Sequence, residues 1–111
     1  LDYPGQPHPR WYGTFPRVLE SYVRERHVLT LPEAVHKMTR LPADRLGLAQ
    51  KGRIEVGADA DLCLFDPAAI HERGTWQAPE QLAAGMDYVF VAGVPAIAKG
   101  RFTGSRNGEV L

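Results

Sequence analysis

The amino-acid sequence predicts an α+β fold, with two to three helices in the first half of the chain and strands in the second. Apolar residues recur at helical spacing in residues 15–23 and 31–38. Beyond Gly47, short apolar runs are separated by glycine and proline, as in strands joined by turns. Because helices and strands are segregated along the chain, we expect a boundary between residues 1–48 and 49–111.

The first ten residues contain three prolines and a glycine, so we expect them to form a loop. Thr14 is the expected N-cap of a first helix, with Pro16 in its first turn and its end near Arg26. One stripe of this helix is apolar and consists of Phe15, Val18, Leu19, Tyr22 and Val23.

A second helix is predicted to begin after Thr30. This threonine and Glu33 fit a capping box, and Pro32 suits the first turn. The apolar stripe of this helix consists of Leu31, Ala34, Val35 and Met38. Residues 42–46 allow one or two further helical turns, which Gly47 can end in a left-handed conformation.

A strand, a turn and a second strand are expected in residues 52–66. Ile54 and Val56 alternate with charged residues, which is the period of a half-buried strand. Gly57 supplies the turn, because it adopts a positive φ at no steric cost. Residues 62–65 form a short apolar run that favours burial on both faces.

The stretch 67–84 has no sustained period, so we expect an irregular excursion with at most one helical turn. Residues 88–92 and 94–98 are both rich in strand-forming residues, and Gly93 lies between them, which predicts a hairpin. Pro95 indicates an edge position for the second of these strands. The polar, glycine-rich tail is expected to lie extended on the surface.

Composition limits the architecture and the partners. With 111 residues and 44% hydrophobic content the chain can form one compact domain, but it is far shorter than the roughly 250 residues of a (β/α)₈ barrel. Thirteen basic residues balance thirteen acidic ones, so neither nucleic acid nor a membrane surface is expected as a partner. The single cysteine cannot form an internal disulfide, and the sequence has no pattern of a membrane span or a signal peptide. We therefore expect a cytoplasmic location.

Two motifs carry a resemblance to a known family. Residues 8–19 read H-P-R-W-Y-G-T-F-P-R-V-L and resemble a segment of N-acyl-D-amino-acid deacylases, the D-aminoacylases. Residues 52–66 follow the pattern G-x-x-x-x-G-x-x-A-D-L-x-x-F-D, which resembles the small β-domain of metal-dependent amidohydrolases. With residues 37–47 and 100–104, the likeness covers nearly the whole chain but only the C-terminal end of the family's chain.

The resemblance implies that the chain is a C-terminal fragment. Residues 1–48 would be the last loop and helices of a (β/α)₈ (TIM) barrel, and residues 49–111 the C-terminal strands of an accessory β-sandwich domain. The parent would hydrolyse the amide bond of N-acyl-D-amino acids, with zinc-activated water as the nucleophile. In the family, the metal ligands and the catalytic aspartate would lie before Leu1, and Asp2 lacks the sequence context of that aspartate. The fragment alone is therefore expected to be inactive and to bind no metal.

Substrate binding is the role that the resemblance implies for Arg10, with His8 and Tyr12 as neighbouring candidates. An arginine at the mouth of a barrel could hold the free carboxylate of the substrate through two parallel hydrogen bonds. The alternative is structural, with Arg10 paired to Asp2 or Glu20 and fixing the path into the helix. For His8 and Tyr12 a structural role is likewise the alternative.

Other reactive side chains are interpreted structurally. The histidines lack the H-x-H and H-x-x-x-H spacing of metal ligands and are expected on the surface; they are His8, His27, His36 and His71. The carboxylates of Asp59, Asp61 and Asp66 are expected to accept hydrogen bonds from backbone amides. Cys63 is expected to be a small buried side chain, and Trp11 and Trp76 are expected to anchor packing and not to bind a ligand.

Two other interpretations stay open. The chain could be a free-standing α+β module for binding or assembly, without catalysis, or a fragment of a hydantoinase- or dihydroorotase-like amidohydrolase. In the parent, the remainder of the barrel would cover the two helical stripes. In the fragment, we expect either that the helices fold back onto the β-part in a packing unlike the parent's, or that the chain self-associates through the stripes.

Overall fold

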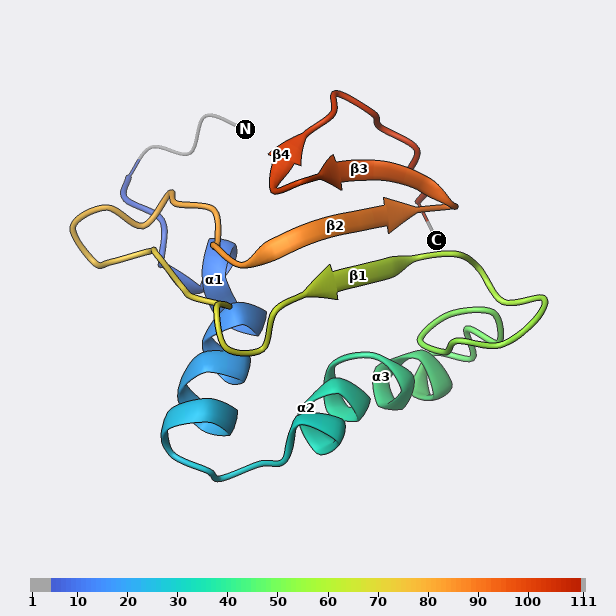
Figure 1. Cartoon of the computed structure of the whole chain (residues 1–111), viewed down its shortest axis with the longest axis horizontal. Coiled ribbons are helices and arrows are strands. Elements are labelled where there is room, and N and C mark those ends of the chain that lie inside the picture. Colours follow the sequence, from blue (N-terminus) through green and yellow to red (C-terminus); the bar gives the residue numbers. More distant parts are fainter. Residues whose placement is uncertain (1–4, 111) are drawn as a thin grey trace.

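The computed structural model describes residues 5–110 and confirms the α+β class (Figure 1). Helices occupy the first half of the chain and a four-stranded sheet the second half. In Figure 1 the helices lie along one side of the molecule and the sheet lies across from them. The predicted loop is present in residues 5–9, and the part of that prediction in residues 1–4 lies outside the described residues.

Helix α1 (Arg10–Arg17) begins before the predicted cap. Pro9 precedes its first residue, and the Pro9 carbonyl accepts the Gly13 N–H at 3.1 Å. Proline suits this place because it has no N–H to leave unpaired and its φ of −51° is already helical. Thr14 therefore lies inside the helix, where its hydroxyl donates to the Arg10 carbonyl, and the prediction that it is the cap is wrong.

Helix α1 runs without a break into η1 (Val18–Glu25), a π-helical segment that ends near Arg26 as predicted. Its last bond runs from the Arg26 N–H to the Ser21 carbonyl and so spans five residues. The apolar stripe predicted for one helix is thus shared by two consecutive helical segments.

Helix α2 (Leu31–Met38) has the predicted capping box. The Thr30 N–H donates to the Glu33 carboxylate at 2.8 Å, and the Glu33 N–H donates back to the Thr30 hydroxyl at 3.4 Å. Helix α3 (Arg40–Arg45) follows, and Gly47 comes after its end with a φ of +71°, as the sequence predicts.

The sheet is antiparallel, and its strands lie side by side in chain order. They are β1 (Leu62–Phe65), β2 (Met86–Val91), β3 (Val94–Ala98) and β4 (Arg101–Phe102). Strands β2 and β3 form a hairpin whose turn residues, Ala92 and Gly93, both have positive φ. Because β4 pairs with Ile97 and Ala98, β3 is not an edge strand and part of the expected surface tail is strand. Pro95 lies outside that pairing.

Residues 52–56 form no strand, contrary to the prediction. Ile54 and Val56 are 91% and 107% exposed, whereas the Arg53 side chain is only 15% exposed and lies 2.7 Å from a carboxylate oxygen of Asp44. The sequence does alternate, but of these four side chains only that of Arg53 turns inward, and Glu55 is 56% exposed. A strand needs a neighbour and an apolar surface to cover, and the described residues offer these residues neither.

Strand β1 is where the sequence predicts it, but it is not buried on both faces. Within the described chain it forms one edge of the sheet and pairs only with β2, so Leu64 is 57% exposed. Cys63 is exposed too, which corrects the prediction of a buried side chain. The turn predicted before β1 is confirmed, since Gly57 has a φ of +92°.

The core lies between the helices and the turn after β1. Its buried centre consists of Leu19, Ala34 and Ile70, and Ile70 comes from the irregular stretch 67–84. Partly buried side chains around it are Val18, Val23, Leu29, Leu31, Met38, Phe65 and Met86. This core is small, and the Cα radius of gyration of 14.9 Å exceeds the roughly 13 Å of a compact domain of this length. The molecule is therefore open on one side.

Candidate functional site

The segment that leads into α1 holds the backbone of Arg10 in place. The Arg10 N–H donates to Nδ1 of His8 at 3.1 Å, and the Trp11 N–H donates to the His8 carbonyl at 3.0 Å. Pro9 between them is buried. The first turn of the helix thus forms around the proline, and the Arg10 side chain is left exposed.

A loop from the second half of the chain, residues 74–77, lies against this segment, as Figure 1 shows beside the start of α1. The side-chain amide of Gln6 donates to two carbonyls of this loop, at 2.8 and 3.0 Å. The His8 ring stands edge-on to the Trp76 indole, with centroids 4.5 Å apart. Trp76 and Trp11 are 67% and 60% exposed, and Trp76 packs against His8 as an anchor at the surface.

The structure does not bring the three predicted substrate-binding residues onto one surface. Arg10 and Tyr12 are two positions apart in α1, which separates them by about 200° around the helix axis. His8 is joined to Arg10 by the hydrogen bond from the backbone. Among the described residues the Arg10 guanidinium has no ion-pair partner, because Glu20 pairs elsewhere. The other suggested partner, Asp2, lies outside the described residues.

Glu20 is at the centre of a polar cluster that sequence reasoning missed. One carboxylate oxygen lies 2.5 Å from Nδ1 of His71, and the other accepts the Glu72 N–H at 2.8 Å. Arg24, one helical turn on, is 3.3 Å away. Partial burial works against the charged form, but the bonds from His71 and Glu72 and the charges of His71 and Arg24 outweigh it. The pKa of Glu20 is therefore below its ordinary value.

The same cluster ties the irregular stretch to the helix. Arg24 donates to the carbonyls of Ile70 and Pro67 at 2.7 and 3.0 Å, and Arg17 lies 3.2 Å from the Glu72 carboxylate. The spacing of Glu20 and Arg24 was visible in the sequence as a helical i, i+4 pair. Their partners, some fifty residues away in the chain, were not.

Carboxylates around β1 have structural partners. Nζ of Lys51 lies 2.9 Å from Asp59 and 2.5 Å from Asp61. Asp61 also accepts the Ala92 N–H in the β2–β3 turn at 2.8 Å, and this bond, with that from Lys51, outweighs desolvation and lowers the pKa of Asp61. Asp66 accepts a backbone N–H two residues further on. The predicted backbone bonds are thus confirmed for Asp61 and Asp66.

Residues 5–110 do not fit the ligand set of a metal ion. Their histidine, cysteine and acidic side chains nowhere form a group of three or more that could hold one. No metal chemistry is therefore assigned to them. In the same part of the chain, no helix combines the length and the apolar character that a membrane crossing requires.

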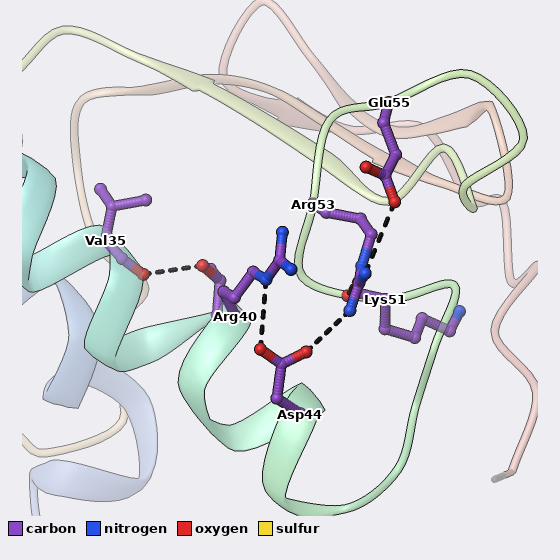
Figure 2. Close-up of polar contacts among 7 residues, drawn as sticks. Val35, Arg40, Asp44, Lys51, Arg53 and Glu55 are labelled. Carbon is purple, nitrogen blue, oxygen red and sulfur yellow. Dashed lines mark hydrogen bonds and ion pairs between the residues drawn. The ribbon is translucent and has the colours of Figure 1, made fainter.

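An apolar groove of about 640 Å³ opens between the helices and β1. Its apolar lining consists of Phe15, Leu19, Pro32, Val35, Met38, Ile54, Leu62, Cys63, Phe65 and Met86. Two of its polar lining residues, Arg40 and Arg53, both pair with Asp44, at 3.1 and 2.7 Å, as Figure 2 shows. This network holds the loop after α3 at the mouth of the groove. Part of the two predicted helical stripes lines this groove, namely Phe15, Leu19, Val35 and Met38.

These observations define the class of protein. The chain belongs to the amidohydrolase family, whose model matches residues 3–97. Its β1 region, hairpin and helices are thus parts of an amidohydrolase fold.

More particular likenesses are to D-aminoacylases. The D-aminoacylase of Alcaligenes xylosoxydans xylosoxydans is 45% identical over the whole chain, which spans 23% of that protein. A solved D-aminoacylase mutant in complex with CuCl₂ matches 95% of the chain with a TM-score of 0.90 and 45% identity. A solved N-acyl-D-glutamate deacylase of Bordetella bronchiseptica, complexed with zinc and a phosphonate mimic of the tetrahedral intermediate, matches 86% with a TM-score of 0.80 and 43% identity.

The chain spans only about a fifth of the length of these relatives, 23%, 22% and 21%. Over that part, however, the helices and the sheet are arranged as in the solved D-aminoacylase. The expectation that the helices fold back in a packing unlike the parent's is therefore wrong.

Proposed function

We propose that this chain is the C-terminal segment of an amidohydrolase that hydrolyses the amide bond of N-acyl-D-amino acids. The observation that carries the proposal is the likeness of the whole chain to D-aminoacylases, both in sequence and in the arrangement of its elements. The same likeness does not favour a free-standing binding module. Residues 1–48 are then the last loop and helices of the barrel, and residues 49–111 belong to the accessory β-domain.

Within this proposal, Arg10 binds the free carboxylate of the substrate. Its side chain is exposed, has no ion-pair partner among the described residues and begins at a backbone position fixed by His8. A guanidinium can meet a carboxylate with two parallel hydrogen bonds. Tyr12 stays a candidate for the same site, although it projects from α1 about 200° around the axis from Arg10.

Zinc is proposed as a cofactor of the full-length enzyme and not of this segment. The solved N-acyl-D-glutamate deacylase contains zinc. As the resemblance to the family implies, the metal ligands and the catalytic aspartate are proposed to lie in other parts of the full-length enzyme. The contribution of this chain is to bind and orient the substrate.

The remainder of the barrel is proposed to cover the apolar groove. The accessible surface of the chain is 8374 Å², whereas a compact monomer of 12.3 kDa exposes roughly 6,100 Å². Large apolar side chains contribute to this excess, since Phe15, Ile54 and Val56 are all more than half exposed. Apolar surface of this extent is stabilised when another part of the protein covers it.

Replacing Arg10 with lysine in the full-length enzyme tests the role of Arg10. Lysine keeps the charge but cannot form two parallel hydrogen bonds, so we expect KM for N-acyl-D-amino acids to rise roughly 10- to 100-fold with kcat little changed. Arg45→Lys is the matched control, because Arg45 is also an exposed helical arginine.

Unchanged kinetics in Arg10→Lys would remove Arg10 from the substrate site. A substrate whose free carboxylate is replaced by an amide gives a second comparison. It should bind poorly to the unaltered enzyme, and Arg10→Lys should change its KM much less. Equal effects on both substrates would show that Arg10 acts on something other than the carboxylate.

A further inference from the structure

Trp76 is an unusual residue for an irregular surface loop. It lies 66 positions after Arg10 in the sequence and is 67% exposed, yet its indole contacts the ring of His8 at a centroid distance of 4.5 Å and an interplanar angle of 70°. An edge-to-face contact of this kind fixes the relative orientation of two rings. The large exposed indole therefore has a specific neighbour, and this neighbour precedes Arg10 by two residues.

The loop around Trp76 supports the whole segment that leads into α1. Gln6 donates its side-chain amide to the Trp76 carbonyl at 2.8 Å and to the next carbonyl at 3.0 Å. Behind it, Gly74 lies so close to Pro9 that an added Cβ would be 3.6 Å from the Pro9 side chain. The segment thus rests on this loop through the Gln6 side chain and the His8 ring.

The loop is itself attached to the helix that carries Arg10. Glu20 binds His71 and the Glu72 N–H, and Arg17 pairs with the Glu72 carboxylate. Gly13 leaves room for this contact, because a Cβ there would lie 2.7 Å from the Glu72 side chain. The stretch that carries Trp76 is therefore held to α1 and η1 at residues 71 and 72, a few positions before the indole.

His8 connects Trp76 to the first residue of α1. Its Nδ1 accepts the Arg10 N–H, while its ring packs against Trp76. A change in the ring's orientation would move the acceptor and with it the first residue of the helix. The orientation of Trp76 is thereby transmitted to the backbone from which the Arg10 side chain starts.

We propose that Trp76 is a positioning residue for Arg10, acting through His8, and this inference rests on the proposed carboxylate-binding role of Arg10. Its effect is on substrate binding and not on the reacting bond. Removing the indole should raise KM for N-acyl-D-amino acids roughly 3- to 10-fold, the size expected for the loss of one aromatic contact. The value of kcat should stay nearly unchanged.

The test uses the full-length enzyme with Trp76→Ala, Trp76→Phe, Arg10→Lys and the double variant of Trp76→Ala with Arg10→Lys. Phenylalanine keeps a ring edge for His8 and should restore most of the affinity. Leu82→Ala is the control, since Leu82 is a large exposed side chain of the same irregular stretch. In the double variant, Trp76→Ala should add almost nothing to the KM of Arg10→Lys, because both changes act on one interaction.

Trp76→Ala could instead raise KM by the same factor in the unaltered enzyme and in the Arg10→Lys enzyme. That result would overturn the inference and leave the role of Arg10 intact. If Arg10→Lys alone has no effect, the proposed function of Arg10 fails and this inference fails with it. A structural measurement covers the case in which Trp76→Ala does not fold. In NMR spectra of the 111-residue chain, Trp76→Leu removes the ring but keeps apolar bulk, so it should shift the Arg10 amide resonance, whereas Trp76→Phe should shift it much less and Leu82→Ala should not shift it. An unshifted Arg10 amide in Trp76→Leu would also overturn the inference.

Discussion

Replacing Glu20 with alanine should destabilise the chain more than any other change of a single surface carboxylate in α1 or η1. The carboxylate bonds His71 and the Glu72 N–H and pairs with Arg24, and its side chain is only 15% exposed. A hydrogen bond to a charged group contributes about 1.5–3 kcal/mol. Arg24 keeps its carbonyl acceptors and the exposed His71 can bond water, so we expect a net loss of about 2 kcal/mol.

Thermal and urea unfolding of the 111-residue chain measure this loss. For a domain of this length, about 2 kcal/mol corresponds to a fall in Tm of roughly 8 °C. Glu25→Ala is the matched control, because Glu25 is an exposed carboxylate of the same helical segment. A loss in Glu20→Ala no larger than in Glu25→Ala would refute the view that this cluster holds the irregular stretch to the helix.

The pH dependence gives an independent check on Glu20. Its pKa is lower in the folded chain than its ordinary value of 4.5, so its charged form stabilises the fold above about that pH. The stabilisation is lost as the pH falls through the folded pKa. The difference in unfolding free energy between the unaltered chain and Glu20→Gln should therefore be constant near neutral pH and shrink below about pH 4.5. A difference that grew on acidification would contradict the lowered pKa.

Two further predictions concern packing. Gly85→Ala should cost about 3 kcal/mol or more in urea unfolding, because Gly85 has a φ of +83° and a Cβ there would lie 2.6 Å from the Ala69 backbone. Gly104→Ala is the control, because Gly104 has a similar φ of +89° but no atom lies within 4 Å of where its Cβ would be, so the cost should be only about 1 kcal/mol. Equal costs in the two variants would show that the clash at Gly85 is not real. The isolated chain should also self-associate through its exposed helical stripe, giving a mass in sedimentation equilibrium that rises with concentration. Phe15→Ser should weaken this association, and a strict monomer at all concentrations would rule it out.

Sequence reasoning succeeded where a structure depends on residues a few positions apart. The capping box of Thr30 and Glu33, the helix end at Gly47 and the hairpin turn at Gly93 all follow from local bonds and backbone preferences. The start of α1 was missed, although its cause is also local. Thr14 was the expected cap, whereas the helix begins after Pro9, where Nδ1 of His8 accepts the Arg10 N–H.

The sequence by itself determined the α+β order and the family resemblance, whereas the start of the first helix at Arg10 came from the structure. Only the tertiary structure decided that residues 52–56 have no neighbouring strand and that their apolar side chains face outward. It alone placed Trp76 against His8 and joined Glu20 to His71. The physical reason is the same in each case. Contacts between residues fifty or more positions apart depend on the path of the whole chain, which no local pattern of residues specifies.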